Sequence, residues 1–444
     1  MMDGQTRLFY GTRRRRAKLA RAEGADIWDV DGRRWLDGSS GAMVCNIGHS
    51  NPRVLDAMRT QMDIATFGYR LHFETEPSER LAERLAQAAP EALERVFFVS
   101  GGSEAVESAL KLARSYALAV GQGQRWKVVS RFPAYHGCTL GALSVTGYAP
   151  MTAPYAPMMA QMPKIPAPRA WLDGLPLDDP ATGHLYADML EARILEEGPE
   201  TVLAFIVEPV GGASTGALVP PAGYMQRVRD ICDRYGVLLI HDEVISGGGR
   251  LGRWFAGDHW GVVPDMITIS KGFGSGYMPL GALIAKDSIC ETVLDHGSYP
   301  HGFTYAGNPL ACAAGMAVMD VIEEDGLMAN AMAKGNSLAM RLRALMQRYG
   351  FIGDVRGMGL LQAFELVSDR DSRAPMPKNL NAYDSLVEAA YDEGLIIYSR
   401  RSRGGHEGDH FLVAPPMIVT DTQIDEIMEK LTRALDRFAI GAGL

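Results

Sequence analysis

Cysteine is scarce and scattered in this sequence. Five cysteines occur among 444 residues, and none belongs to a C-x-x-C pair: they are Cys45, Cys138, Cys232, Cys290 and Cys312. An odd number of singly placed cysteines argues against a disulfide framework and against a zinc site. We therefore expect no bound metal and a reducing compartment, the cytoplasm.

Positive charge is also in deficit. The net charge is −9 and the pI is near 5.6, whereas nucleic-acid-binding proteins usually carry a basic excess. The arginines at 13–16 form the one basic cluster. We interpret this cluster as a solvated stretch ahead of the first strand rather than a targeting or nucleic-acid patch. No nucleic-acid partner is expected.

Long apolar runs are absent as well. The run at 202–207 is far shorter than a membrane-spanning helix and ends at Glu208 and Pro209. The N-terminus has no apolar core of the kind found in secretory signals. We therefore expect no membrane partner.

The remaining composition, 47% apolar and 22% charged residues, is that of an ordinary globular protein. Short apolar runs followed by glycine-rich turns and helical periodicity recur from about residue 60 to residue 320. This alternation predicts an α/β fold with a mostly parallel sheet covered on both faces. The expected strands lie at 96–99, 128–129, 204–207, 237–240, 266–269 and 281–285, with a helix at 104–116.

The chain is too long for one simple core, so we expect sub-domains. Residues 60–325 are predicted to form the large domain, in which the prolines between 150 and 180 indicate a long surface loop. Residues 326–444 are predicted to form a smaller α+β domain, and residues 1–59 to accompany it. The small domain's expected elements are helices at 329–349, 382–393 and 421–438, the last capped by Thr420, and strands at 360–366 and 395–398.

A glycine-rich turn, Ser100-Gly101-Gly102-Ser103, follows the predicted strand at 96–99 and opens a helix. Glycines allow backbone N–H groups to approach an anion, and a helix N-terminus adds partial positive charge, so this turn could cradle a phosphate. A plain strand-to-helix turn with a serine cap explains the motif about as well. The motif lacks the lysine of a P-loop.

Asp242 and Glu243 directly follow the predicted strand at 237–240. The carboxyl ends of strands in open α/β sheets are the places where ligands bind. A buried carboxylate needs a cationic partner, which could be a structural salt bridge or the protonated ring nitrogen of a cofactor. No His/Asp constellation with metal-ligand spacing accompanies it.

Lysine is rare, with nine lysines against 35 arginines, and Lys271 stands at the end of an apolar strand before glycines. A lysine near the ligand edge of a sheet is poised to lose its proton, as Schiff-base chemistry requires. Taken alone, a lysine snorkelling from a strand end is the better explanation.

Two further loops carry candidate residues. Tyr135, in the sequence Ala-Tyr-His-Gly, could stack on a flat ring or belong to the core. Thr304, in the sequence His-Gly-Phe-Thr-Tyr-Ala-Gly, presents a hydroxyl before a helix, which by itself indicates only a turn.

These pieces occur in a set order: SGGSEAVESALKLAR, AYHG, EPVGG, HDEVISGGGR, SKGFGSG and HGFTYAGNPLACAA. The combination resembles the class III aminotransferases, which are fold-type I enzymes that use pyridoxal 5′-phosphate (PLP). The resemblance covers nearly the whole chain, from Trp28 to Met417. It implies a large domain with a mostly parallel sheet and a smaller α+β domain.

The resemblance implies a role for each matched residue. Lys271 would form the Schiff base with PLP and then act as base and acid in the 1,3-proton shift, while Asp242 would pair with the pyridinium nitrogen. Val244 and Tyr135 would pack on the two faces of the ring. The remaining cofactor contacts would be Gly102, Ser103, Glu208 and, from the second subunit of a homodimer, Thr304.

The resemblance also implies transfer of an amino group from an ω-amino acid or amine to a keto acid such as pyruvate, by a ping-pong mechanism. An arginine usually clamps the substrate carboxylate, and the one that ornithine- and GABA-type relatives carry before the Pro-Pro pair is missing here. Arg400 is our candidate clamp, with Arg401 and Arg403 as alternatives. Met43 stands where many ω-amine enzymes have tryptophan, so we expect a roomier donor pocket.

Two other interpretations stay open. PLP-dependent racemases, aminomutases and decarboxylases share this scaffold, and Lys271 and Asp242 would serve them equally. Outside the enzymes, the alternative is a non-catalytic protein whose phosphate cradle binds a nucleotide.

Overall fold

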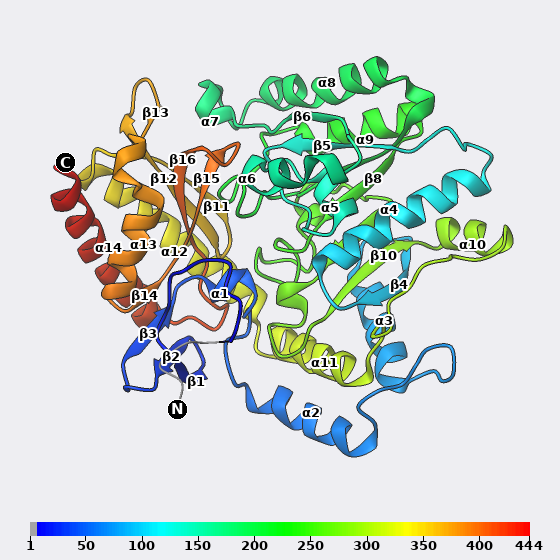
Figure 1. Ribbon diagram of the computed structural model, residues 1–444, viewed down its shortest axis with the longest axis horizontal. Helices are drawn as coiled ribbons and strands as arrows, with labels where there is room; N and C mark the ends of the chain where they lie inside the picture. Colours follow the sequence, from blue (N-terminus) through cyan, green and yellow to red (C-terminus); the bar gives the residue numbers. More distant parts are fainter. Residues whose placement is uncertain (1–6) are drawn as a thin grey trace.

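A computed structural model describes residues 7–444, which form two domains of unequal size (Figure 1). The larger domain is built on a seven-stranded sheet with the order β4-β10-β9-β8-β7-β5-β6. Its strands are β4 (Leu93–Val99), β5 (Lys127–Phe132), β6 (Lys164–Pro166), β7 (Val202–Val207), β8 (Leu238–Asp242), β9 (Met266–Ile269) and β10 (Gly281–Lys286).

The strands of this sheet pair in parallel from β6 through β9. In this sheet, β10 runs antiparallel to both of its neighbours, β9 and β4. The predicted mostly parallel α/β fold is therefore confirmed. Each of the six expected strands is present, because each is a continuous apolar run that can be buried on both faces.

Helices cover both faces of the large sheet. The strand β7 shows the arrangement, since all six of its residues are buried. Phe205 and Val207 pack in one cluster with residues of α8 and α9, whereas Ala204 and Ile206 pack on the opposite face with residues of α4. The helices of this domain are α3 (Glu76–Ala88), α4 (Gly102–Ala119), α5 (Leu140–Val145), α8 (Pro180–Glu197), α9 (Tyr224–Tyr235), α10 (Asp287–Asp295) and α11 (Pro309–Glu324).

The predicted surface loop between residues 150 and 180 is wrong in part. This stretch contains the short helices α6 (Ala149–Thr152) and α7 (Ala170–Asp173) and the strand β6, which adds to the sheet in parallel with β5. Proline is tolerated in a strand at the edge of a sheet, where a missing N–H breaks no ladder. The proline content therefore concealed an edge strand.

The smaller domain combines the N-terminal segment with the C-terminal part of the chain. A four-stranded sheet has the order β1-β2-β3-β14, and β14 pairs in parallel with β3. A second sheet has the order β11-β12-β16-β15, with β13 beside β12. The strands are β1 (Leu19–Glu23), β2 (Asp26–Asp29), β3 (Arg34–Asp37), β11 (Ile352–Met358), β12 (Leu361–Asp369), β13 (Ala374–Pro375), β14 (Leu395–Ile396), β15 (Tyr398–Arg403) and β16 (Glu407–Val413).

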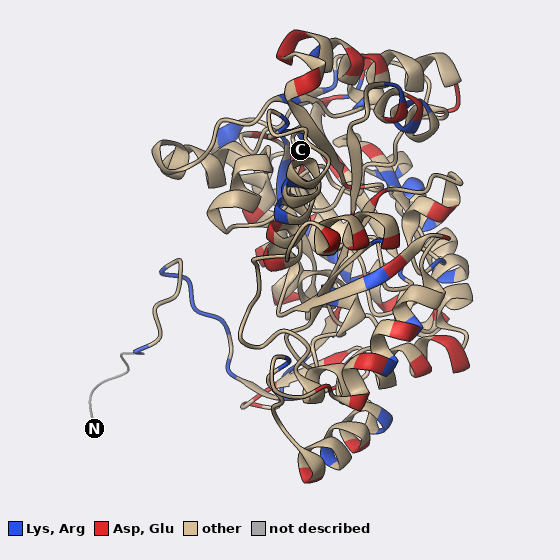
Figure 2. Cartoon of the chain, turned by 90° about the vertical axis from the view of Figure 1, so that its right-hand side faces the viewer, with Lys and Arg blue, Asp and Glu red and all other residues tan. Residues whose placement is uncertain are grey.

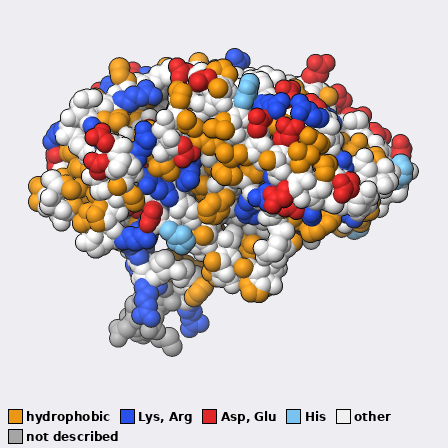
Figure 3. Space-filling view, turned by 90° about the horizontal axis from the view of Figure 1, so that it is seen from above, with side chains coloured by type: hydrophobic (Ala, Val, Ile, Leu, Met, Phe, Trp, Pro, Cys, Tyr) orange, Lys and Arg blue, Asp and Glu red, His pale blue; other side chains and the backbone are white. Residues whose placement is uncertain are grey.

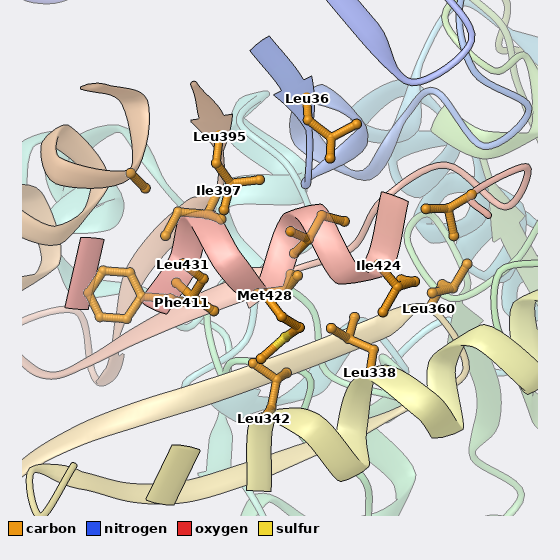
Figure 4. Close-up of a cluster of buried hydrophobic side chains, with 14 of the residues drawn as sticks. Leu36, Leu338, Leu342, Leu360, Leu395, Ile397, Phe411, Ile424, Met428 and Leu431 are labelled. Carbon is orange, nitrogen blue, oxygen red and sulfur yellow. The ribbon is translucent and has the colours of Figure 1, made fainter. Parts of the chain in front are cut away.

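The predicted strand at 395–398 is thus divided between two sheets. Helices α12 (Leu327–Arg348), α13 (Ala382–Asp392) and α14 (Asp421–Ala442) cover these sheets. In the core, Ile424 and Leu431 of α14 lie close to Leu338 and Leu342 of α12 (Figure 4). The predicted cap is confirmed, since Thr420 and Gln423 form a complete capping box at the start of α14.

From residue 7 onward, the described part of the N-terminal segment projects from the body of the molecule, and Lys and Arg residues gather along it (Figures 2 and 3). The interpretation of this basic cluster as merely solvated is incomplete. Arg14 pairs with Asp384 and Glu388 on α13, and Arg16 also pairs with Glu388. No helix within residues 7–444 is long and apolar enough to cross a membrane.

We expect Leu431→Ala to lower the free energy of unfolding by about 2–5 kcal/mol, because Leu431 is fully buried and its loss leaves a cavity. Urea denaturation followed by circular dichroism measures the change. Ile440→Ala is the matched control on the same helix, since Ile440 is 82% exposed and its loss should change stability by less than about 0.5 kcal/mol. Equal effects of the two substitutions would contradict the packing described here.

Candidate active site

One cavity gathers most of the candidate residues at the carboxyl ends of the parallel strands. It is lined by Asp242 at the end of β8 and by residues of the turns that follow β4, β5, β7 and β9. Seven of the ten residues predicted from the sequence line it: Gly102, Ser103, Tyr135, Glu208, Asp242, Val244 and Lys271. Residues far apart in the sequence therefore meet at the edge of the sheet where ligands bind in such folds.

Lys271 directly follows Ser270 at the end of β9 and has a strained backbone, with φ at +47°. Its carbonyl accepts hydrogen bonds from the N–H groups of Gly274 and Ser275, which close a tight turn. Burial lowers the pKa of Lys271 to about 8, although the negative charges of Asp242 and Glu208 oppose this shift. A substantial fraction of its amine is therefore neutral near physiological pH.

Asp242 lines the same cavity as Lys271 and is held by three neighbours. His136 Nδ1–H donates to Asp242 Oδ2 at 2.8 Å. Asp242 Oδ1 accepts from the Val244 N–H at 3.1 Å and from Thr268 Oγ1 at 3.3 Å. The carboxylate is 4% exposed, and these bonds fix its orientation toward the cavity.

The residues flanking Asp242 do not line the cavity. His241 and Glu243 are both fully buried, and burial lowers the pKa of His241 to about 3 and raises that of Glu243 to about 7. Glu243 accepts hydrogen bonds from Ser246 Oγ and the Gly257 N–H. Of the three consecutive polar residues His241, Asp242 and Glu243, Asp242 is thus the one that lines the cavity. Successive side chains along a strand point to opposite faces of the sheet.

The glycine-rich turn at the start of α4 forms another wall. A Cβ at Gly102 would lie 2.8 Å from Val244 Cγ1, and a Cβ at Gly137 would lie 2.7 Å from Ser103 Oγ. Ser103 Oγ also accepts a hydrogen bond from the Cys138 N–H at 3.1 Å. This close packing leaves backbone and hydroxyl groups at the helix N-terminus, an arrangement that suits a phosphate.

The side chain of Glu208 is hydrogen-bonded to the backbone of Tyr135. Glu208 Oε1 accepts from the Tyr135 N–H at 3.0 Å, and Glu208 Oε2 accepts from the Gly212 N–H at 2.6 Å. The buried Arg131 donates to the Glu208 carbonyl at 2.6 Å. Burial raises the pKa of Tyr135 to about 12, so its hydroxyl stays protonated at neutral pH.

Arg400, Met43 and Thr304 are not among the described residues that line this cavity. Arg400 lies on β15 with its guanidinium 4.7 Å from the centre of the Tyr398 ring. Met43 is 1% exposed and packs in a cluster that also holds Val210, which lines the cavity. Thr304 is exposed in the loop between α10 and α11.

The three candidate arginines differ in their partners. Arg401 pairs with Asp409 at 2.9 Å, and Arg403 lies 3.5 Å from Glu365. In the part of the chain that the structure describes, no carboxylate lies within 4.0 Å of Arg400, whose Nη1 donates to the Ser399 carbonyl. Of the three candidate arginines, Arg400 is therefore the one whose charge has no carboxylate partner in the described chain and can bind a ligand.

Sequence reasoning missed two of the side chains that hold Asp242. His136, which orients Asp242, lies beside Tyr135 in a motif whose tyrosine alone received a role. Thr268, which also contacts Asp242, is one strand residue among apolar neighbours and carries no signal in the sequence. The adjacency of His136 to an aromatic residue at a strand end was the available signal.

Comparisons with known proteins agree with this geometry. The sequence profile of the aminotransferase class-III family matches residues 10–435. A putrescine–pyruvate aminotransferase of Pseudomonas aeruginosa is 33% identical over 95% of this chain and 91% of its own length. An uncharacterized aminotransferase of Bacillus subtilis, YodT, is 36% identical over 92% of both chains.

Solved structures give the same result. A thermostable (S)-enantioselective ω-transaminase from Thermomicrobium roseum has a TM-score of 0.90 and 37% identity over 95% of this chain and 93% of its own. A PLP-bound amine transaminase from an uncultivated Pseudomonas species has a TM-score of 0.89 and 34% identity over 98% and 99%. The fold and the site together define a PLP-dependent transferase of fold type I. Within that class, the chain belongs to the class III aminotransferases.

The cavity residues fit PLP on structural grounds. A lysine amine with a lowered pKa and a fixed carboxylate line the same cavity, and the turn at Gly102 and Ser103 offers anion-binding groups. Tyr135 and Val244 supply an aromatic and an aliphatic surface for a flat ring.

We expect Lys271 in the PLP-free protein to react with an amine-specific reagent half-maximally near pH 8. Below that pH the amine is protonated and protected, and above it the amine is neutral and nucleophilic. Competitive labelling followed by peptide mass spectrometry measures the titration. The urea-unfolded chain is the reference, in which the same lysine should titrate near the ordinary value of about 10.4. Equal midpoints in both states would contradict a desolvated Lys271.

Proposed function

We propose that this class III aminotransferase moves an amino group from an ω-amino acid or amine to a keto acid such as pyruvate, by a ping-pong mechanism. The observation that carries the proposal is the Lys271 amine, held with a lowered pKa beside the cavity that Asp242 faces. A relative that shares a third of its sequence is named a putrescine–pyruvate aminotransferase, which supports this pair of substrate classes.

PLP, when bound, supplies an aldehyde for imine exchange and an electron sink for the bond broken at the amine-bearing carbon. Lys271 Nζ would be the group that holds the cofactor, and its free amine would be the base and acid that moves the proton of the substrate carbon. A pKa near 8 suits both directions of this transfer, because the neutral and protonated forms coexist.

Asp242 holds a proton on the ring nitrogen of the cofactor. His136, Thr268 and the Val244 N–H fix its carboxylate, so the interaction needs no reorganisation during the reaction. Gly102 and Ser103 bind the phosphate, Tyr135 and Val244 hold the two ring faces, and Glu208 supports the Tyr135 segment.

Arg400 is proposed to bind the substrate carboxylate. Its charge is not paired with an acid in the described chain, and it stacks on Tyr398. Tyr398 in turn lies close enough to Tyr135 to influence its pKa. An amine donor without a carboxylate offers Arg400 no partner. An Arg400 side chain that can turn out of the pocket therefore suits both the amine and the keto acid.

Thr304 is proposed to reach the cofactor phosphate of a second subunit. The adjacent Tyr305 is 65% exposed and contacts Phe67, with ring centres 5.8 Å apart. Leu71 and Phe73 of the same region are also exposed. Exposed apolar side chains clustered around this loop favour a homodimer contact there. Met43, buried behind Val210, is proposed to shape the donor pocket from its second layer.

The function is tested by absorbance spectroscopy of the purified holoenzyme. We expect a yellow band that is lost when an amine donor is added and restored by pyruvate, with release of the carbonyl product and alanine. Lys271→Ala should lose this cycle, because it removes the amine that attaches the cofactor and transfers the proton. A yellow protein that no amine converts would favour racemase, mutase or decarboxylase chemistry instead.

Arg400→Leu should raise the KM for pyruvate by about 10- to 100-fold, the equivalent of losing a charge-assisted hydrogen bond of about 1.5–3 kcal/mol. The KM for an amine without a carboxylate should change little. Arg401→Leu is the matched neighbour, because Arg401 is already paired with Asp409. Steady-state kinetics with both substrates measures these KM values. A larger rise of the KM for pyruvate in Arg401→Leu than in Arg400→Leu would identify Arg401 as the residue that binds the carboxylate.

A further inference from the structure

A cluster of three different metal-ligating side chains lies outside the active-site cavity. Asp37 at the end of β3, Cys45 and His49 have ligand atoms that all lie within 4.8 Å of one another. His49 Nε2 is 3.1 Å from Asp37 Oδ2. The sequence spacing alone predicts no metal site, because each of these residues is single and Asp37 lies eight residues before Cys45.

The backbone between Asp37 and Cys45 explains how the cluster forms. Ser40, Gly41 and Met43 all have positive φ, at 50°, 65° and 56°. This left-handed stretch includes the short helix α1 (Ser40–Met43), which lies between the two domains (Figure 1). The chain therefore doubles back and returns Cys45 to the carboxylate of Asp37.

The donor set has the chemistry of a borderline-soft divalent cation. Thiolate, imidazole and carboxylate are the ligands of Zn²⁺, at about 2.3, 2.0–2.1 and 2.0–2.2 Å from the metal. A tetrahedral ion with those bond lengths needs ligand atoms roughly 3.3–3.7 Å apart. The distance of 3.1 Å between His49 Nε2 and Asp37 Oδ2 is already near that spacing. Ligand atoms as far apart as 4.8 Å would have to move about 1 Å closer together to bind the same ion.

The surroundings orient these groups and favour positive charge at the centre. The Ser39 N–H donates to Asp37 Oδ1 at 3.2 Å, and the Gly41 N–H lies 3.0 Å from both carboxylate oxygens, as outer-shell partners do in metal sites. The carboxylate is fully buried, whereas Cys45 and His49 are partly exposed and leave a path from solvent.

Arg250 is the nearest opposing charge, since it interacts electrostatically with both Asp37 and Cys45. Its positive charge opposes a cation at this site, whereas the buried carboxylate of Asp37 favours one.

We propose that Asp37, Cys45 and His49 form a binding site for a divalent cation of the Zn²⁺ type, with water as the fourth ligand. The site adjoins the turn that carries Lys271. The Ile47 N–H donates to Ser275 Oγ at 3.0 Å, and the Asn51 N–H donates to the Tyr277 hydroxyl at 2.7 Å. A bound cation would clamp the segment of Cys45 and His49 against this turn and stabilise it.

The test is equilibrium dialysis of the full-length holoenzyme against Zn²⁺ after chelator treatment, with metal content measured by elemental analysis. We expect one equivalent per chain and a higher melting temperature. Cys45→Ser and His49→Gln should each weaken binding by more than the roughly 10- to 100-fold that loss of an outer-shell partner costs. Cys290→Ser is the matched control, because Cys290 is a partly buried free cysteine outside the cluster and should leave binding unchanged.

A crystal of the wild-type holoenzyme soaked in Zn²⁺ provides a readout that does not depend on the variants folding. An anomalous peak within coordination distance of Cys45 Sγ, His49 Nε2 and Asp37 supports the proposal. A peak only at the cofactor phosphate or at other surface residues overturns it. Equal Zn²⁺ binding by the wild type and the two cluster variants overturns it as well.

Discussion

The buried guanidinium of Arg250 lies where three parts of the chain meet and donates hydrogen bonds to all of them. Arg250 is 0% exposed, and within residues 7–444 no carboxylate pairs with it. Burial lowers its pKa to about 10. Its acceptors are Asn46 Oδ1, Ser40 Oγ and the carbonyls of Leu360, Ala414 and Pro415.

This junction fixes the turn that carries Lys271. Asn46, whose side-chain oxygen accepts from Arg250, donates through Nδ2 to the Gly248 carbonyl. A Cβ at Gly272 would lie only 2.1 Å from Asn46 Nδ2. The strained backbone of Lys271 is therefore held by neighbours from the N-terminal segment and from the loop after β8, because strain of this kind persists only where surrounding contacts determine it.

The sequence predicted the large sheet well because its strands are continuous apolar runs, as at 202–207, and such runs have few alternative structures. It predicted poorly where local composition and tertiary context disagree. The strand β6 contains Pro166 and was expected to be a loop, since the edge position that tolerates proline cannot be seen in one segment. The split of residues 395–398 between two sheets likewise depends on contacts with β3 and β16.

The site residues divide in the same way. Three candidates, Lys271, Asp242 and Tyr135, stand at strand ends within distinctive motifs, and the order of these motifs identified them in the sequence. The structure brings all three into one cavity. The sequence favoured Arg400 over Arg401 and Arg403, but it could not show which of these adjacent arginines already has an acidic partner. That depends on Asp409 and Glu365, which lie on strands paired with or near β15 and neutralise two of the three charges.

The parallel pairing of β3 with β14 has a consequence for biosynthesis. Leu36 lies opposite Leu395, so β3 cannot complete its sheet until a strand about 360 residues later in the chain has been made. Contacts of such long sequence separation form late and slowly. During translation the large domain can fold while β1, β2 and β3 wait without their partner. The N-terminal strands are therefore the part of the nascent chain that most needs protection from pairing with other chains.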